Sequence, residues 1–149
     1  MANPENNSSR SCVIGESDLF IARLLQRFAE NSGLQVHLAR TGEEVVELVQ
    51  RVLPVLVVLE PELPGKVRGW EAARTLAQSR QSQSIPVMVC SWQKKADVAL
   101  LIGQVSAYLQ KPDLRYEDFI VALEAAGVKT GSGPSGSNFT HEGKDFILK

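Results

Sequence analysis

The chain has 149 residues, 44% of them hydrophobic and 22% charged, which predicts one globular domain with a buried core. Its 16 basic and 17 acidic residues leave a formal net charge of −1, so no field attracts nucleic acid or a membrane surface. No apolar run approaches the roughly 18 residues of a membrane span, and the polar first residues lack the core of a signal peptide. We therefore expect a cytoplasmic protein.

The two ends of the chain differ in composition from its centre. Residues 1–10 are polar and predict a disordered arm. Residues 129–137 have the Gly-Ser-rich composition of a flexible linker, and the tail up to residue 149 is too short to fold alone. The folded domain is therefore expected over residues 11–128.

The first half of this domain alternates between strand and helix patterns. A short apolar run predicts a strand over 11–15, and residues 18–33 carry Phe20, Leu24 and Phe28 on one helical face, with Gly33 placed to end the helix. Alternating apolar residues predict a strand over 34–40. A helix over 41–53 follows, with Thr41 as its N-cap.

The second half continues the same alternation. Residues 55–59 form an uninterrupted apolar run, as expected of a central parallel strand. The remaining patterns predict helices over 69–80, 94–104 and 115–128, and strands over 85–91 and 106–110. Such alternation indicates an α/β fold whose parallel sheet is covered by helices on both faces. Cys12 and Cys90 lie within apolar runs and are expected to be packing residues.

Polar side chains follow four of the predicted strands at the point where each strand ends. Glu16 and Ser17 follow the first strand, Glu60 the third, Ser91 and Trp92 the fourth, and Lys111-Pro112 the fifth. In doubly wound sheets the functional site lies beyond the carboxyl ends of the strands, so we expect these side chains to converge there.

This order of residues resembles the receiver domain of two-component response regulators, the CheY-like superfamily, over residues 11–128. The resemblance implies a doubly wound, flavodoxin-like fold with a five-stranded parallel sheet in the order 2-1-3-4-5. It also assigns places to individual residues. Glu16 and Ser17 fall on the family's acidic pair, Glu60 on the phospho-acceptor aspartate, Ser91 on the switch hydroxyl, Tyr108 on the switch aromatic and Lys111 on the lysine before proline.

Two of these positions depart from the family's pattern. Glu60 is one methylene longer than aspartate, so its carboxylate overreaches the in-line geometry that phosphoryl transfer requires. Ser17 offers a neutral hydroxyl where magnesium prefers a carboxylate. The sequence therefore predicts an atypical receiver, or pseudo-receiver, that is not phosphorylated, has no cofactor and offers magnesium a poor site.

Two roles remain open for Glu60. As a permanent negative charge it could mimic the phosphorylated state, drawing Ser91 and Tyr108 inward. Alternatively it pairs with Lys111 and only neutralises a buried edge of the sheet. The structural role is the favoured hypothesis, because a carboxylate substitution alone does not bias a conformation.

The expected function is that of a non-enzymatic signalling or scaffold module that acts through protein–protein contact. By resemblance, a protein partner or a second copy of the chain docks on the face made by the last two helices and the strand between them. That face is predicted to include Trp92, Lys94, Lys95, Val98, Tyr108, Arg115 and Tyr116.

Two alternatives remain, and the second of them belongs to another functional class. The first is a phosphorelay receiver that still accepts a phosphoryl group on Glu60. The second is a flavodoxin-like cofactor binder, which is disfavoured because acidic residues follow the first strand where a phosphate would lie.

Overall fold

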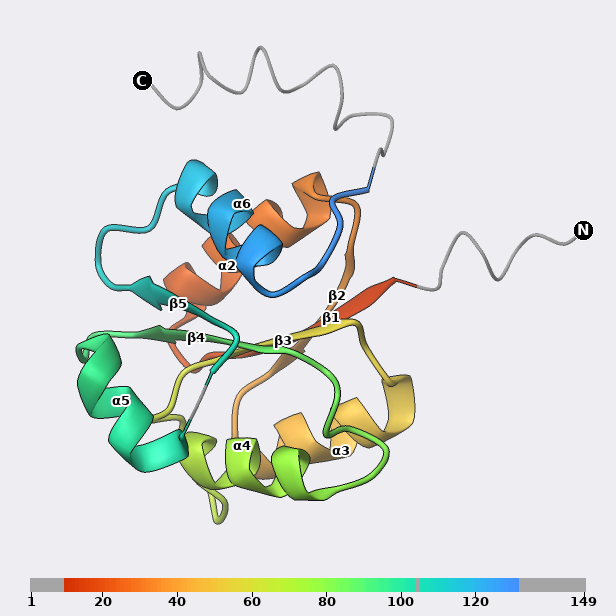
Figure 1. Ribbon diagram of the computed structural model, residues 1–149, viewed down its shortest axis with the longest axis vertical. Helices are drawn as coiled ribbons and strands as arrows, with labels where there is room; N and C mark the ends of the chain where they lie inside the picture. Colours follow the sequence, from red (N-terminus) through yellow and green to blue (C-terminus); the bar gives the residue numbers. More distant parts are fainter. Residues whose placement is uncertain (1–9, 104, 132–149) are drawn as a thin grey trace, which may run out of the picture.

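The computed structural model describes residues 10–103 and 105–131 and shows a sheet between two layers of helices (Figure 1). All strand pairs are parallel, in the order β2-β1-β3-β4-β5. The strands are β1 (Ser11–Gly15), β2 (Gln35–Ala39), β3 (Leu56–Leu59), β4 (Val87–Ser91) and β5 (Ala107–Gln110). The predicted α/β fold and its strand order are confirmed. The expected arm and most of the expected tail lie outside the described residues.

Five helices cover the two faces of the sheet (Figure 1). Helices α2 (Leu19–Asn31) and α6 (Tyr116–Ala125) lie on one face, and α3 (Gly42–Val52), α4 (Gly69–Gln78) and α5 (Lys95–Ile102) lie on the other. Four helices begin one residue after the predicted start, because the first residue of each predicted range is an N-cap with extended backbone. Thr41 is confirmed as one of these caps, and its hydroxyl accepts a hydrogen bond from the Glu44 amide.

The strands supply both cores because successive side chains point to opposite faces of a sheet. On the α2/α6 side, Cys12, Ile14, Leu56 and Val58 pack with Phe119 and other apolar residues. On the α3/α4 side, Val13, Val57 and Leu59 pack with residues of those helices. Cys12 and Cys90 are buried free cysteines, as the packing interpretation requires.

The prediction for Phe20 is wrong. The helical stripe placed it on the buried face of α2, but its side chain is 77% exposed. It lies in the first turn of the helix, whereas Leu25 and Phe28, further along the same helix, pack into the core. None of the helices in the described part of the chain has both the length and the hydropathy needed to cross a bilayer.

Candidate functional site

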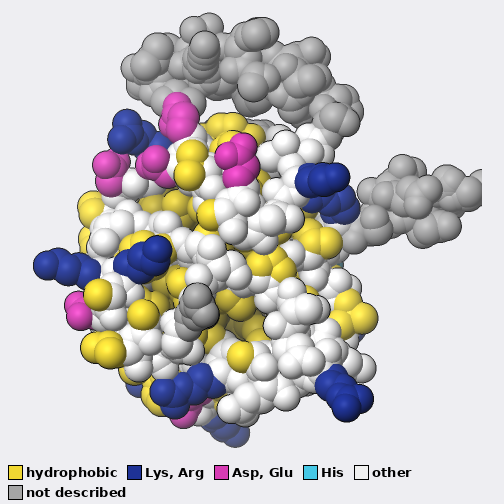
Figure 2. Space-filling view, viewed as in Figure 1, with side chains coloured by type: hydrophobic (Ala, Val, Ile, Leu, Met, Phe, Trp, Pro, Cys, Tyr) yellow, Lys and Arg dark blue, Asp and Glu magenta, His cyan; other side chains and the backbone are white. Residues whose placement is uncertain are grey.

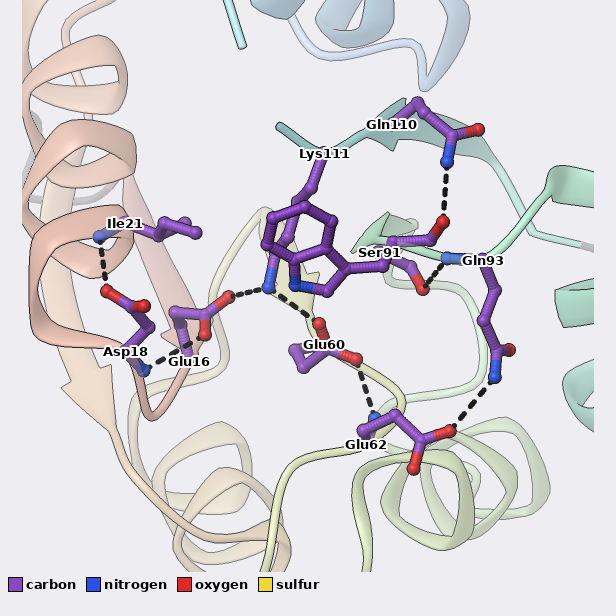
Figure 3. A network of polar contacts seen from close by, with 10 residues as sticks. Glu16, Asp18, Ile21, Glu60, Glu62, Ser91, Gln93, Gln110 and Lys111 are labelled. Carbon is purple, nitrogen blue, oxygen red and sulfur yellow. Dashed lines mark hydrogen bonds and ion pairs between the residues drawn. The ribbon is translucent and has the colours of Figure 1, made fainter. Parts of the chain in front are cut away.

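The carboxyl ends of four strands, or the residues that follow them, bring four predicted site residues together (Figure 3). Glu16 follows β1, Glu60 follows β3, Ser91 ends β4 and Lys111 follows β5. All four residues are buried, with exposed fractions of 5%, 5%, 1% and 4% in that order. The parallel sheet accounts for this convergence, since its topology places all these strand ends at one edge.

Lys111 lies between the two glutamates and pairs with both. Its Nζ is 2.6 Å from Glu60 Oε1 and 2.8 Å from Glu16 Oε1. The contact with Glu60 is a charge-assisted hydrogen bond, in which the ammonium donates. Glu16 Oε1 has no hydrogen-bond donor in good geometry among the described residues, so the charge of Lys111 alone offsets its burial.

The second oxygen of each glutamate accepts a hydrogen bond from the backbone. The Glu62 amide donates to Glu60 Oε2 over 2.7 Å, and the Asp18 amide donates to Glu16 Oε2 over 3.0 Å. Each carboxylate is therefore held at both ends, by Lys111 on one side and by its own loop on the other.

The cluster holds two carboxylates and one ammonium in a largely dry environment. Burial acts to lower the pKa of Lys111, but its contacts with Glu16 and Glu60 raise that pKa overall. Cys90 lies beneath the cluster, and burial raises the pKa of its thiol to about 12, so it stays protonated at neutral pH.

Ser17 and Asp18 do not join this cluster. Ser17 is exposed, and Asp18 is the N-cap of α2, where its Oδ1 accepts hydrogen bonds from the amides of Phe20 and Ile21. Across residues 10–103 and 105–131, no group of three or more histidine, cysteine, aspartate or glutamate side chains is arranged to hold a metal ion.

Ser91 and Tyr108 lie next to each other at the end of the sheet. Ser91 Oγ accepts a hydrogen bond from the Gln93 amide, so the hydroxyl is engaged by its own loop. Tyr108 is half-buried, and its hydroxyl is 3.5 Å from Gln110 Oε1. Burial raises the pKa of the Tyr108 phenol, and the neighbouring Ser91 hydroxyl acts in the opposite direction.

The loop between β3 and α4 is anchored on the start of α3. The Gly42 amide donates to the Pro64 carbonyl, and Glu43 Oε1 accepts from the Val67 amide. Gly65 has φ +123°, a conformation that favours glycine and lets the loop turn beside Thr41 and Glu43. The loop therefore has a defined path that ends where Gly69 packs against the Glu60 carbonyl.

Three further polar residues contact this site and were not singled out from the sequence. Gln93 Nε2 donates to Glu62 Oε2 over 3.1 Å, and Gln110 Nε2 donates to the Trp92 carbonyl over 2.7 Å (Figure 3). Isolated glutamines and a loop glutamate match no motif. The only signal in the sequence was their position within three residues of a strand end.

The predicted docking face is exposed in part. Trp92 is 60% exposed, and Lys94, Lys95 and Arg115 are also exposed. Leu100, which was not predicted to be part of this face, is 84% exposed on α5. Figure 2 shows acidic side chains gathered over α6, while lysine and arginine side chains are spread over this side of the molecule.

Val98 and Tyr116 do not fit that face as predicted. Val98 is fully buried and is the buried residue of α5, so it cannot contact a partner. Tyr116 is half-buried and turns toward α2. Its ring lies 5.6 Å from that of Phe28, and its hydroxyl is 3.3 Å from Ser32 Oγ.

Comparison with protein-family models identifies the class that this fold and this strand-end cluster define. The model of the response regulator receiver domain matches residues 13–123. The chain belongs to this family, whose members act in two-component signalling.

Solved structures support the same fold. A putative response regulator from Chloroflexus aurantiacus superposes with a TM-score of 0.70 at 20% identity, over 79% of this chain and 98% of that one. A sensor protein from Polaromonas sp. JS666 gives a TM-score of 0.69 at 24% identity, over 78% and 94%. The receiver domain of sensor histidine kinase PA1611 from Pseudomonas aeruginosa, solved with magnesium in its active-site cleft, gives 0.68 at 17% identity, over 80% and 98%.

Proposed function

We propose that this receiver domain signals through protein–protein contact and is independent of phosphorylation. The observation that carries the proposal is the state of Glu60, which occupies the acceptor position. One of its oxygens is bound by the Lys111 ammonium and the other by the Glu62 amide. Both oxygens of its carboxylate are therefore already engaged by neighbouring groups of the protein.

Phosphoryl transfer to Glu60 meets two geometric obstacles. A nucleophilic carboxylate oxygen must approach phosphorus in line, and small displacements of a reacting atom reduce the rate strongly. The extra methylene of glutamate shifts the carboxylate outward. The hydrogen bond from the Glu62 amide, at 2.7 Å, also holds the oxygen that does not face Lys111.

The donor set also fits magnesium poorly. Magnesium prefers hard anionic oxygens in octahedral array, but Glu16 and Glu60 already share the Lys111 ammonium. Ser17 contributes no carboxylate, and Asp18 is used as a helix cap. The magnesium seen in the PA1611 receiver domain belongs to that protein. We propose that this chain works without the ion.

Within this proposal, Glu60 has the structural role rather than the mimic role. Its carboxylate neutralises Lys111, which is only 4% exposed. Ser91 Oγ is engaged by the Gln93 amide in its own loop, whereas a mimic of the phosphoryl group would draw this hydroxyl toward Glu60. The site therefore acts as a fixed support for the surrounding loops.

The proposed output surface lies next to this support. Trp92 follows Ser91 directly and is 60% exposed, and exposed tryptophan is favoured at the centre of protein interfaces. Lys94 at the N-cap of α5, and Lys95 and Leu100 on that helix, are exposed as well, so the segment after β4 offers both apolar and positively charged side chains. A protein partner docks there, and no reaction is catalysed.

Intact-mass spectrometry tests the proposal. The purified chain is incubated with magnesium and acetyl phosphate, and we expect no gain in mass. A stoichiometric gain of one phosphoryl group at Glu60, stable to acid and labile to base, would overturn it in favour of a phosphorelay receiver.

A double variant, Glu60→Asp with Ser17→Asp, serves as the matched control. It restores the shorter acceptor and the second acid in the same scaffold, so we expect it to gain a labile phosphoryl group under the same conditions. That gain shows that the remaining residues and the assay support the chemistry.

A further inference from the structure

The two loops at the rim of the site are joined by a direct side-chain contact. Glu62 lies in the loop after β3, Gln93 lies in the loop after β4, and Gln93 Nε2 donates to Glu62 Oε2 over 3.1 Å (Figure 3). We call this contact the Glu62–Gln93 bridge. Its acceptor is a carboxylate, which makes it stronger than a hydrogen bond between neutral groups.

Both ends of the bridge continue into the buried cluster. The backbone amide of Glu62 donates to Glu60 Oε2, and the backbone amide of Gln93 donates to Ser91 Oγ. The bridge therefore closes a path of hydrogen bonds that runs from Lys111 through Glu60 and the two loops to the end of β4.

Trp92 lies between Ser91 and Gln93, the two residues at the β4 end of this path. Gln110 Nε2 on β5 donates to the Trp92 carbonyl over 2.7 Å, and the residue after Trp92 is held by the bridge. The main chain of an exposed tryptophan is thus fixed from two directions, by a neighbouring strand and by the loop that follows the acceptor position.

We propose that Glu62, Gln93 and Gln110 are positioning residues that hold the Trp92 turn, residues 92–94, in one conformation without a phosphoryl group. One consequence of this inference rests on the proposed function: the docking surface is already formed before a partner arrives. Ordering a loop on binding reduces affinity, so a turn that is ordered in advance favours the complex.

The chemistry of the bridge allows a reciprocal test. Gln93→Glu places two carboxylates against each other and breaks the contact. Combining it with Glu62→Gln exchanges donor and acceptor, so the hydrogen bond forms again in the opposite sense. Gln78→Ala, an exposed glutamine on α4 remote from both loops, is the matched control.

Amide hydrogen exchange reports the order of the turn directly. In the absence of magnesium and phosphodonor, we expect the amides of residues 92–94 in Gln93→Glu to exchange about fivefold faster, as loss of one ordinary side-chain hydrogen bond allows. The Glu62→Gln, Gln93→Glu double variant is expected to return to the wild-type rate, and Gln78→Ala to leave it unchanged.

Trp92 fluorescence provides the second readout. Because the chain has two tryptophans, the measurement is made in a Trp70→Phe background. We expect lower steady-state anisotropy in Gln93→Glu and recovery in the double variant.

Wild-type exchange and anisotropy in Gln93→Glu would overturn the inference. So would a folded double variant, shown by an unchanged thermal midpoint, that fails to recover. The mass assay described above is independent of both readouts. If the wild type gains a phosphoryl group while Gln93→Glu still loosens the Trp92 turn, the proposed function is wrong. The positioning role of the Glu62–Gln93 bridge stands in that case.

Discussion

Lys111 is the residue on which the buried charges of the site depend. It is the cation shared by Glu16 and Glu60, and all three residues are at most 5% exposed. Removing one partner from a buried ion pair leaves an uncompensated charge, which is more destabilising than the pair itself is stabilising. The same residue therefore determines both the stability and the pH response of this end of the sheet.

Replacing Lys111 with methionine is expected to lower the free energy of unfolding by about 3–5 kcal/mol, because two buried carboxylates lose their counter-charge. Urea denaturation at neutral pH measures the change. As a control, Glu47→Gln removes the exposed Glu47–Arg51 pair on α3 and should change stability by less than about 0.5 kcal/mol. Equal effects of the two substitutions would contradict the account.

The raised pKa of Lys111 predicts a loss of stability in alkaline solution. A group whose pKa is higher in the folded state stabilises the fold at pH values below its unfolded pKa, here 10.5, and loses that contribution as pH rises through the folded value. The stability difference between wild type and Lys111→Met should therefore be constant near neutral pH and shrink above about pH 10.5. Urea denaturation of both proteins across this range provides the check, and a difference that grows with pH has the wrong sign.

At the scale of elements, the loop between β3 and α4 is set by its contact with the first turn of α3. Gly42 begins this helix, and a Cβ atom there would lie 1.9 Å from the Val67 carbonyl oxygen. The Glu43 carboxylate holds the same segment, and the hydrogen bond from the Val67 amide lowers the pKa of Glu43. The path of the loop past Glu60 thus depends on the start of a neighbouring helix.

Gly42→Ala should destabilise the protein by about 2 kcal/mol, since the added methyl group forces the loop away from α3. Alanine is intrinsically the better helix former, so a loss of stability must come from this steric contact. Thermal or urea unfolding gives the magnitude. A stabilised variant would show that the loop is free to move.

The same scale shows which features could be predicted from the sequence. Strand and helix periods, together with caps such as Thr41, predicted every element, and the topology of a parallel sheet brought Glu16, Glu60, Ser91 and Lys111 together. The inward side of α5 could not be predicted. Val98, Leu100, Leu101 and Ile102 make this helix apolar on most sides, so periodicity does not separate the buried Val98 from the exposed Leu100.

The bridge between the loops was also beyond the sequence. Glu62 and Gln93 are 31 residues apart, and neither carries a motif. Their contact depends on the relative placement of two loops, which local patterns do not specify. The ion pairs of Lys111 were easier to predict from the sequence, because the resemblance to receiver domains already placed Lys111 near Glu60.

At the scale of the whole molecule, the fold is that of a receiver domain. The polar groups at its strand ends bind one another and the adjacent loops. The Glu60 carboxylate binds Lys111, and the Ser91 hydroxyl at the end of β4 accepts a hydrogen bond from its own loop. These contacts tie the strand ends to the loops after β3 and β4. We propose that this arrangement is the working state and that no phosphoryl group changes it.

The most direct test is the two-dimensional amide NMR spectrum of the wild-type chain, recorded before and after adding magnesium and acetyl phosphate. We predict coincident spectra, with the amides of Ser91, Trp92, Tyr108 and Lys111 unshifted. Displacement of these resonances together with those of α5 and α6 would show a phosphorylation switch and contradict the account.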